Sequence, residues 1–168
     1  AVSIAVARDG DLQHAVVYDP VRPELFTASR GEGTRLYGMP VRVSDCRGLS
    51  EALLGTGFPF KAQEHLDLYL STFRELFGRS RGVRRAGAAS LDLAYVACGR
   101  LDGFWEFGLQ AWDMAAGALL IQEAGGRVAD LSGQDQYLLT GNVVAGNSVV
   151  FDEILTSIRP ILHGGMDR

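Results

Sequence analysis

The chain has 168 residues, of which 47% are hydrophobic and 21% are charged, and its formal net charge at pH 7 is -4. This length is typical of one globular domain, and no window approaches the ~18 consecutive apolar residues of a membrane span. The negative net charge argues against general affinity for nucleic-acid phosphates, so we expect neither membrane insertion nor direct nucleic-acid binding.

Residues 1–60 contain predicted hairpins. The segments 2–7 and 13–18 are rich in apolar residues and flank a turn around Gly10, which is typical of two antiparallel strands. The chain opens on Ala1 without a methionine or a leader pattern. We therefore interpret the opening as a buried strand and expect further sequence upstream.

A second predicted hairpin joins residues 24–29 to residues 34–37 through Gly31 and Gly33. Glycines at this spacing also occur in phosphate-binding loops, but no helical pattern follows them here. They therefore indicate a turn. Two further strand segments are predicted, at residues 41–43 and 52–58.

Residues 61–168 alternate between helical and strand patterns. Apolar residues recur at helical spacing from His65 to Phe77 and stop at Gly78, which predicts an amphipathic helix. The remaining predicted segments are strands at 82–85, 103–107, 127–130 and 142–145, helices at 88–98, 112–124 and 149–162, and a frayed tail at 163–168. This alternation predicts a mixed or parallel sheet covered by helices.

Cysteine and histidine usage argues against disulfides and zinc. Cys46 and Cys98 are far apart, and the three histidines are scattered, so the spacing fits no metal motif and indicates a reduced, cytoplasmic compartment. His65 alone is better explained as a surface or capping residue than as a ligand.

Asp113 is the strongest candidate for chemistry. It lies in the first turn of the predicted helix 112–124, whose apolar run ends at Gly125 and Gly126. An acid in a first turn is favoured by the helix dipole, and alone it is most simply an N-terminal capping residue. The same position also suits a bound cation, because Mg²⁺ prefers carboxylates together with water and phosphate oxygens.

Other acids lie near this segment, and nucleophile motifs are absent. Glu106 precedes the helix, Asp92 falls inside the helix 88–98, and Asp102 falls in the following turn. Solvent exposure or turn chemistry explains Asp92 and Asp102. The sequence contains neither a Gly-x-Ser-x-Gly motif nor a Walker-type loop, which leaves oxygen-ligand chemistry.

Residues 106–126 resemble the second signature motif of the inositol monophosphatase family of Mg²⁺-dependent, lithium-sensitive phosphatases. Residues 84–95 resemble the strand-to-helix element that precedes this motif, and residues 140–147 resemble the stretch that follows it. The resemblance covers essentially the whole chain and is closest to a bacterial branch that also serves in transcription antitermination. It implies a layered α/β/α/β/α sandwich of the α/β class, a homodimer, and residues 1–168 as the C-terminal portion of one phosphatase domain.

The resemblance also implies roles for particular residues. Asp113 matches a carboxylate that binds a catalytic Mg²⁺ near the substrate, and Glu106 matches the acid that binds an inositol hydroxyl. The turn whose backbone N–H groups face the substrate is matched by Gly87, Ala88 and Ala89. The family commonly has Ser or Thr directly after this glycine, whereas this chain has Ala88, so a hydroxyl contact is lost while the backbone donors remain.

One family motif has no counterpart. The Asp-Pro-apolar-Asp-Gly-Thr/Ser motif and an upstream Glu supply the other metal ligands in the family. Asp19 and Pro20 begin like that motif, but the second Asp and the Gly-Thr do not follow, so we interpret them as a turn. Two-metal phosphate chemistry needs more than one carboxylate, so we expect the 168 residues to be inactive by themselves.

The resemblance leaves three functions open. The first is hydrolysis of inositol monophosphate, or of a related sugar or polyol phosphate, by a metal-activated water in the complete protein. The second is a partnership with the transcription machinery, with hydrolysis secondary, which a basic cluster could serve if it is not merely a solvated loop; the cluster comprises Arg79, Arg81, Arg84 and Arg85. The third is a related phosphatase acting on histidinol phosphate, fructose bisphosphate or adenosine bisphosphate.

Overall fold

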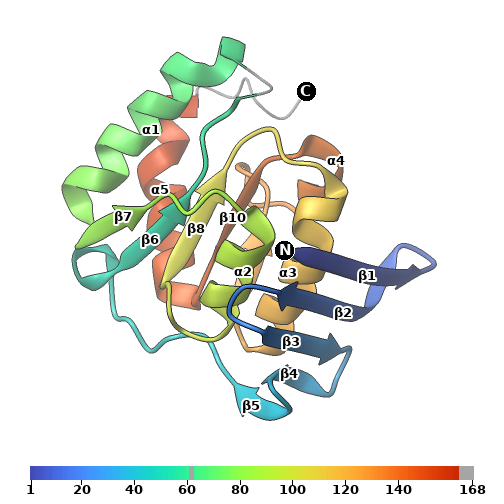
Figure 1. Cartoon of the computed structure of the whole chain (residues 1–168). Coiled ribbons are helices and arrows are strands. Elements are labelled where there is room, and N and C mark those ends of the chain that lie inside the picture. Colours follow the sequence, from blue (N-terminus) through green and yellow to red (C-terminus); the bar gives the residue numbers. More distant parts are fainter. Residues whose placement is uncertain (61–62, 163–168) are drawn as a thin grey trace.

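The helices and strands of the protein alternate in layers (Figure 1). The computed structural model describes residues 1–60 and 63–162, and the predicted tail lies outside them. An outer layer of two helices covers one sheet, two more helices lie between this sheet and a second sheet, and the layers are therefore α/β/α/β. These are four of the five layers expected from the sequence. The four helices are α1 (Leu66–Arg79), α2 (Ala89–Ala97), α3 (Ala111–Glu123) and α5 (Ser148–Leu162).

The first sheet is an antiparallel meander, and both predicted hairpins are confirmed. Its strands follow chain order: β1 (Val2–Arg8), β2 (Asp11–Asp19), β3 (Glu24–Ser29), β4 (Gly33–Leu36) and β5 (Met39–Val41). Side chains alternate between the two faces, so Ala15, Val17 and Phe26 point inward and are buried in the same apolar cluster as α2 and α3 side chains. The strand predicted at 41–43 forms earlier, as β5.

The opening strand forms as predicted, but the expectation that it is buried is wrong. β1 is an edge strand that pairs with β2. Its apolar side chains are largely exposed, with exposed fractions of 45% for Val2, 54% for Ile4 and 50% for Val6. Apolar composition predicts a strand, whereas the position of that strand in the sheet decides how much of it is covered.

The second sheet is mixed, as the alternation of elements predicts. Its order is β7-β6-β8-β10-β9, with β6 (Leu53–Thr56), β7 (Gly82–Arg84), β8 (Gly103–Glu106), β9 (Arg127–Ala129) and β10 (Val143–Gly146). β6 is parallel to β7 and β8, and β10 is antiparallel to β8 and β9. The C-terminal ends of β6 and β8 therefore meet at one edge of this sheet.

Close packing fixes α2 and α3 against each other between the sheets. A side chain at Gly117 of α3 would overlap Leu93 of α2, so only glycine allows the two helices to approach this closely. Three short elements had no counterpart in the sequence prediction: η1 (Leu49–Glu51), η2 (Gln63–His65) and α4 (Tyr137–Thr140). None of the helices in the described part of the chain is both long and apolar enough to cross a membrane.

Candidate functional site

The edge of the second sheet brings the predicted substrate-binding acid beside a glycine. Glu106 is the last residue of β8, and Gly57 directly follows β6. Because these strands pair in parallel, with Thr56 opposite Trp105, the two residues lie side by side. A Cβ on Gly57 would overlap the Glu106 carboxylate. The absence of a side chain at Gly57 therefore makes the space that Glu106 occupies.

The predicted small-residue turn opens α2 near the same edge. Gly87 has a φ of +92°, a left-handed conformation that glycine adopts without strain. Ala88 is the N-cap residue of α2, and no side chain caps the helix there. The first N–H groups of a helix have no partner in the helix backbone. Ala89 can therefore present a donor to an anion, whereas the Ala88 N–H interacts with the Asp92 carboxylate.

Asp113 occupies the first turn of α3 and makes one capping contact. Its Oδ2 accepts a hydrogen bond from the Gln110 N–H at 3.0 Å, and the residue is half-buried. No hydrogen bond within residues 1–60 and 63–162 reaches the other carboxylate oxygen, Oδ1. Asp113 therefore caps the helix as predicted, and its Oδ1 remains available as a metal ligand.

The acids of this edge are electrostatically coupled. Burial, together with the negative charges of Asp92 and Asp113, raises the pKa of Glu106 to about 8, and the Arg85 guanidinium opposes the rise. Burial likewise raises the pKa of Asp92 to about 7, against a backbone hydrogen bond from Ala88 and the charge of Arg85. The structure therefore brings Glu106 and Asp113 within electrostatic reach of each other, together with Asp92 and Arg85, which were noted from the sequence but not assigned to this site.

Asp92 corrects one sequence interpretation. Solvent exposure was expected to account for this acid, but its exposed fraction is only 2%. It lies in α2 among apolar neighbours, with Leu93 and Ala94 fully buried. A single acid within an otherwise apolar helix was the signal that could have identified it, since acids are rarely buried without a reason.

Arg85 stands apart from the rest of the predicted basic cluster. Its guanidinium lies 5.3 Å from the centre of the Phe58 ring and 5.0 Å from that of Phe60, as in cation–π contacts. Arg79, by contrast, pairs with Glu75 at 3.2 Å. Within this cluster, Arg79 therefore has a structural role, whereas Arg85 acts on the acids of the site.

The turn interpretations made from the sequence are confirmed. The N–H groups of Gly31 and Gly33 donate to the Glu123 carboxylate, each at 2.9 Å, so an acid of the chain itself occupies the place that a phosphate would take. Asp19 accepts the Val21 N–H at 2.9 Å, which is an Asx turn. His65 is the N-cap residue of α1, where its side chain makes no capping hydrogen bond.

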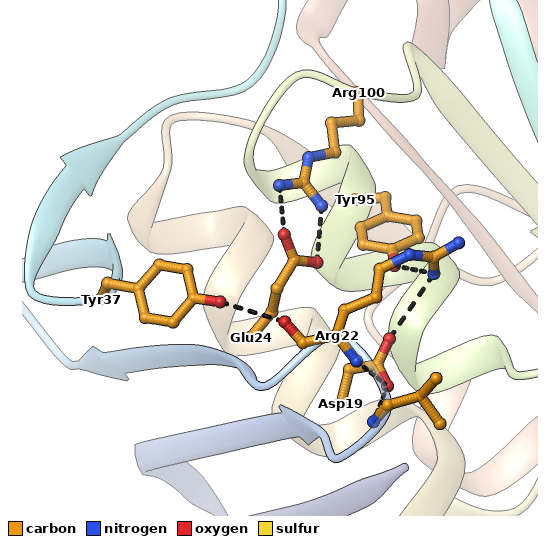
Figure 2. Close-up of polar contacts among 7 residues, drawn as sticks. Asp19, Arg22, Glu24, Tyr37, Tyr95 and Arg100 are labelled. Atoms are coloured by element: carbon orange, nitrogen blue, oxygen red, sulfur yellow. Dashed lines mark hydrogen bonds and ion pairs between the residues drawn. The ribbon is translucent and has the colours of Figure 1, made fainter.

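A separate group of polar residues clamps the first sheet to α2 (Figure 2). Arg100 donates two hydrogen bonds to the Glu24 carboxylate, at 2.6 and 2.7 Å. Arg22 Nη1 lies 3.5 Å from Asp19 Oδ2 and donates a hydrogen bond to the Tyr95 hydroxyl at 2.9 Å. We call Asp19, Arg22, Glu24, Tyr95 and Arg100 the clamp. Its acids are matched by arginines, whereas Asp92 and Glu106 make no ion pair within the described residues.

The described residues do not contain a complete metal site. No group of three or more His, Cys, Asp or Glu side chains is arranged there to hold a metal ion. A cavity of about 290 Å³ lies between α3, α4 and the β1–β2 turn, lined by residues such as Gln122 and Tyr137. It contains none of the predicted site residues, so we do not assign the chemistry to it.

Comparison with known proteins identifies relatives along the whole chain. The model of the inositol monophosphatase family matches residues 1–163. The chain is 59% identical over 170 residues to the Nus factor SuhB of Pseudomonas aeruginosa, and 51% identical over 168 residues to that of Escherichia coli K12. Both alignments cover 100% of this chain and 63% of the relative, so the chain spans less than two thirds of their length.

Solved structures agree with this comparison. The structure of an inositol monophosphatase from Anabaena (Nostoc) sp. PCC 7120 superposes with a TM-score of 0.90 at 40% identity. The superposition covers 94% of this chain and 65% of that chain. The layered architecture predicted from the sequence is therefore confirmed.

Proposed function

The chain belongs to the inositol monophosphatase family, and from that premise we propose that the protein to which it contributes is a Mg²⁺-dependent phosphomonoesterase. The proposed substrate is inositol monophosphate or a related polyol phosphate. The observation that carries the proposal is the meeting of Glu106, Asp113 and the Gly87–Ala89 turn at one edge of the second sheet.

Each part of this edge suits one part of a phosphate monoester. The free N–H groups at the start of α2 suit the phosphate oxygens. The Glu106 carboxylate can accept a hydrogen bond from a hydroxyl of the alcohol. This carboxylate occupies the space left by the missing side chain at Gly57. Asp113 would hold Mg²⁺ through Oδ1, since its Oδ2 is engaged by the Gln110 N–H, which also orients the carboxylate.

The chemistry divides between the metal and these residues. Bound Mg²⁺ supplies an activated water and stabilises the negative charge of the leaving oxygen. The residues of this chain bind and orient the ester, which places phosphorus in reach of attack. Further carboxylate ligands would come from sequence outside this chain, as Asp113 is the one carboxylate here that we assign to the metal. We expect the protein in the cytoplasm and in a homodimer.

The full-length protein tests this proposal. We expect phosphate release from inositol monophosphate that requires Mg²⁺, and we expect Asp113→Asn to lower kcat by at least about a hundredfold because one metal ligand is weakened. The thermal unfolding of the variant should match the wild type. Near-normal turnover in the variant would remove the ligand assignment, and wild-type protein without phosphatase activity would remove the proposed function.

A second function is favoured by the relatives named Nus factor, which are 59% and 51% identical. We propose that the protein also binds the transcription machinery, using exposed arginines at the end of β7. Binding of the full-length protein to purified RNA polymerase and elongation factors should weaken in Arg84→Ala and Arg85→Ala. Arg30→Ala, in the first sheet, is the control. Binding that is absent, or unchanged in both variants, would contradict this second proposal.

A further inference from the structure

Asp92 is a buried acid that has no role in the proposed hydrolysis. Its exposed fraction is 2%, yet no side chain within the described residues forms an ion pair with it. Its charge is compensated by a backbone hydrogen bond from Ala88 and, at longer range, by Arg85. A buried carboxylate held in this way is costly for a fold. Such groups gather at functional sites.

Two glycines at the end of β6 place Asp92 next to Glu106. A Cβ on Gly57 would overlap the Glu106 carboxylate, and a Cβ on Gly55 would lie 3.8 Å from the Asp92 Cβ. Residues two apart in a strand face the same side of the sheet. Leu101 and Phe104 fill the space directly above Gly55, and the two acids lie on the same side of the sheet, consistent with the effect of the Asp92 charge on Glu106.

The charges of Asp92, Glu106 and Arg85 do not sum to zero when both acids are ionised. Arg85 is the basic residue whose charge acts on both Asp92 and Glu106. It is exposed and held over Phe58 and Phe60, so it offsets one negative charge and leaves the other. The charge of Asp113, under the proposed function, is taken up by the metal. Above about pH 8, where both acids are ionised, the site beside the Gly87–Ala89 turn is therefore negative overall.

We propose that Asp92 is a specificity-determining residue that, together with Glu106, makes the site select phosphate monoesters with an uncharged or cationic alcohol. This inference rests on the proposed function and refines its substrate class. A hydroxyl or an ammonium group can donate to the Glu106 carboxylate, whereas a second phosphate would be repelled by the net negative charge of the ionised acids in a partly buried site where screening is weak. Among the substrates left open by the sequence, fructose bisphosphate and adenosine bisphosphate are disfavoured. Inositol monophosphate and histidinol phosphate remain.

Two matched substrates and one isosteric variant test the inference in the full-length, Mg²⁺-loaded protein at pH 9, where both acids are ionised. The substrates are inositol monophosphate and an inositol bisphosphate with its second phosphate on a neighbouring hydroxyl. Removing the Asp92 charge by Asp92→Asn should raise the ratio of kcat/KM for the bisphosphate to that for the monophosphate by about tenfold. A merely structural role would lower both values together and leave the ratio unchanged.

Asp19→Asn is the matched control. Asp19 is also buried, with an exposed fraction of 4%, but it lies in the first sheet, where its Oδ1 accepts the Val21 N–H at 2.9 Å. Asparagine can accept the same bond through its own Oδ1. The substrate ratio of this variant should equal that of the wild type.

The outcomes separate this inference from the proposed function. An unchanged ratio in folded Asp92→Asn protein overturns the role of Asp92, whatever the wild-type activity. If that variant does not fold, Asp92→Ser is measured in the same way. If the wild type hydrolyses neither compound, the proposed hydrolysis fails. Titration calorimetry with the same two compounds then decides whether Asp92→Asn removes the discrimination in binding, and equal discrimination in both proteins rejects the inference.

Discussion

The clamp acids and the pair Asp92 and Glu106 are two groups of largely buried acids, and they differ in what surrounds them. In the clamp, Arg100 holds the pKa of Glu24 below its ordinary value by hydrogen bonding, and a backbone hydrogen bond from Val21 holds that of Asp19 below its ordinary value. In the pair Asp92 and Glu106, burial raises the pKa to about 7 and about 8. The clamp acids are ionised and hydrogen-bonded to groups of the protein. Asp92 and Glu106 have fewer such partners and can accept hydrogen bonds from a ligand.

This difference indicates which acids stabilise the protein and which are kept for a ligand. A carboxylate that accepts bonds from arginine or from backbone N–H groups has few sites left for another donor. A carboxylate buried beside glycine and a second acid has lost water without gaining a full set of partners. We therefore expect substitutions in the clamp to change stability, and substitutions around the pair to change activity.

The largest expected effect is that of Gly57→Ala. Its methyl group would overlap the Glu106 carboxylate, and that side chain would have to turn away from its place at the end of β8. We expect kcat/KM for inositol monophosphate to fall by about a hundredfold in the full-length protein, mainly through KM, because a positioned hydrogen-bond acceptor is lost.

Gly78→Ala is the control for this substitution. Gly78 lies in the last turn of α1, and an added Cβ meets nothing within 4 Å. Alanine there should leave activity unchanged and slightly stabilise the helix. Comparable activity of the Gly57 and Gly78 variants would contradict the proposal that Gly57 positions Glu106.

Next in size is the effect of Arg100→Met on stability. It removes both hydrogen bonds to Glu24 and leaves a nearly buried carboxylate unpaired while keeping the stem of the side chain. We expect the free energy of unfolding to fall by about 2 kcal/mol in urea titrations, with little change in phosphatase activity.

Arg22→Met gives the comparison within the clamp. The Arg22 side chain is 65% exposed, and Asp19 keeps its backbone donors without it. This variant should therefore lose less than about 1 kcal/mol. A larger loss for Arg22→Met than for Arg100→Met would contradict the role given to the Glu24 pair.

The smallest effect is a difference in pH dependence between the two groups. The folded-state pKa values of Asp92 and Glu106 lie above the values of an unfolded chain, near 4. The folded protein therefore binds more protons between pH 4 and 8, and its stability falls as pH rises through that range. In the metal-free full-length protein, the stability of Asp92→Asn relative to wild type should therefore rise as the pH is raised from 4 to 9.

The clamp should show the opposite sign. The folded-state pKa of Glu24 is lowered, so the stability from its ion pair is present above the unfolded pKa and is lost as pH falls below it. Glu24→Gln should therefore be less stable than wild type at pH 7 and approach it near pH 3. Parallel stability profiles for Glu24→Gln and Asp92→Asn would show that the two groups do not differ as described.

Local patterns in the sequence predicted most of the elements. Glycine turns flanked by apolar segments predicted the hairpins of the first sheet. Helical spacing predicted α1, and an apolar run ended by two glycines predicted α3, with boundaries within about two residues. Family resemblance supplied the expected roles of Glu106, Asp113 and the Gly87–Ala89 turn. The short helix α4 was missed because four residues carry too little periodicity to be recognised.

The sequence by itself determined the succession of strands and helices and the positions of the turns, because these depend on neighbouring residues and on backbone conformations such as that of Gly87. Only the tertiary structure decided which acids share an environment. Asp92 and Glu106 are separated by a helix end, a turn and a strand. They come close because α2 packs over β6 and β8, which pair in parallel, while Gly57 leaves space for the Glu106 carboxylate. Burial and electrostatic coupling depend on such distances, which residue spacing along the chain does not contain.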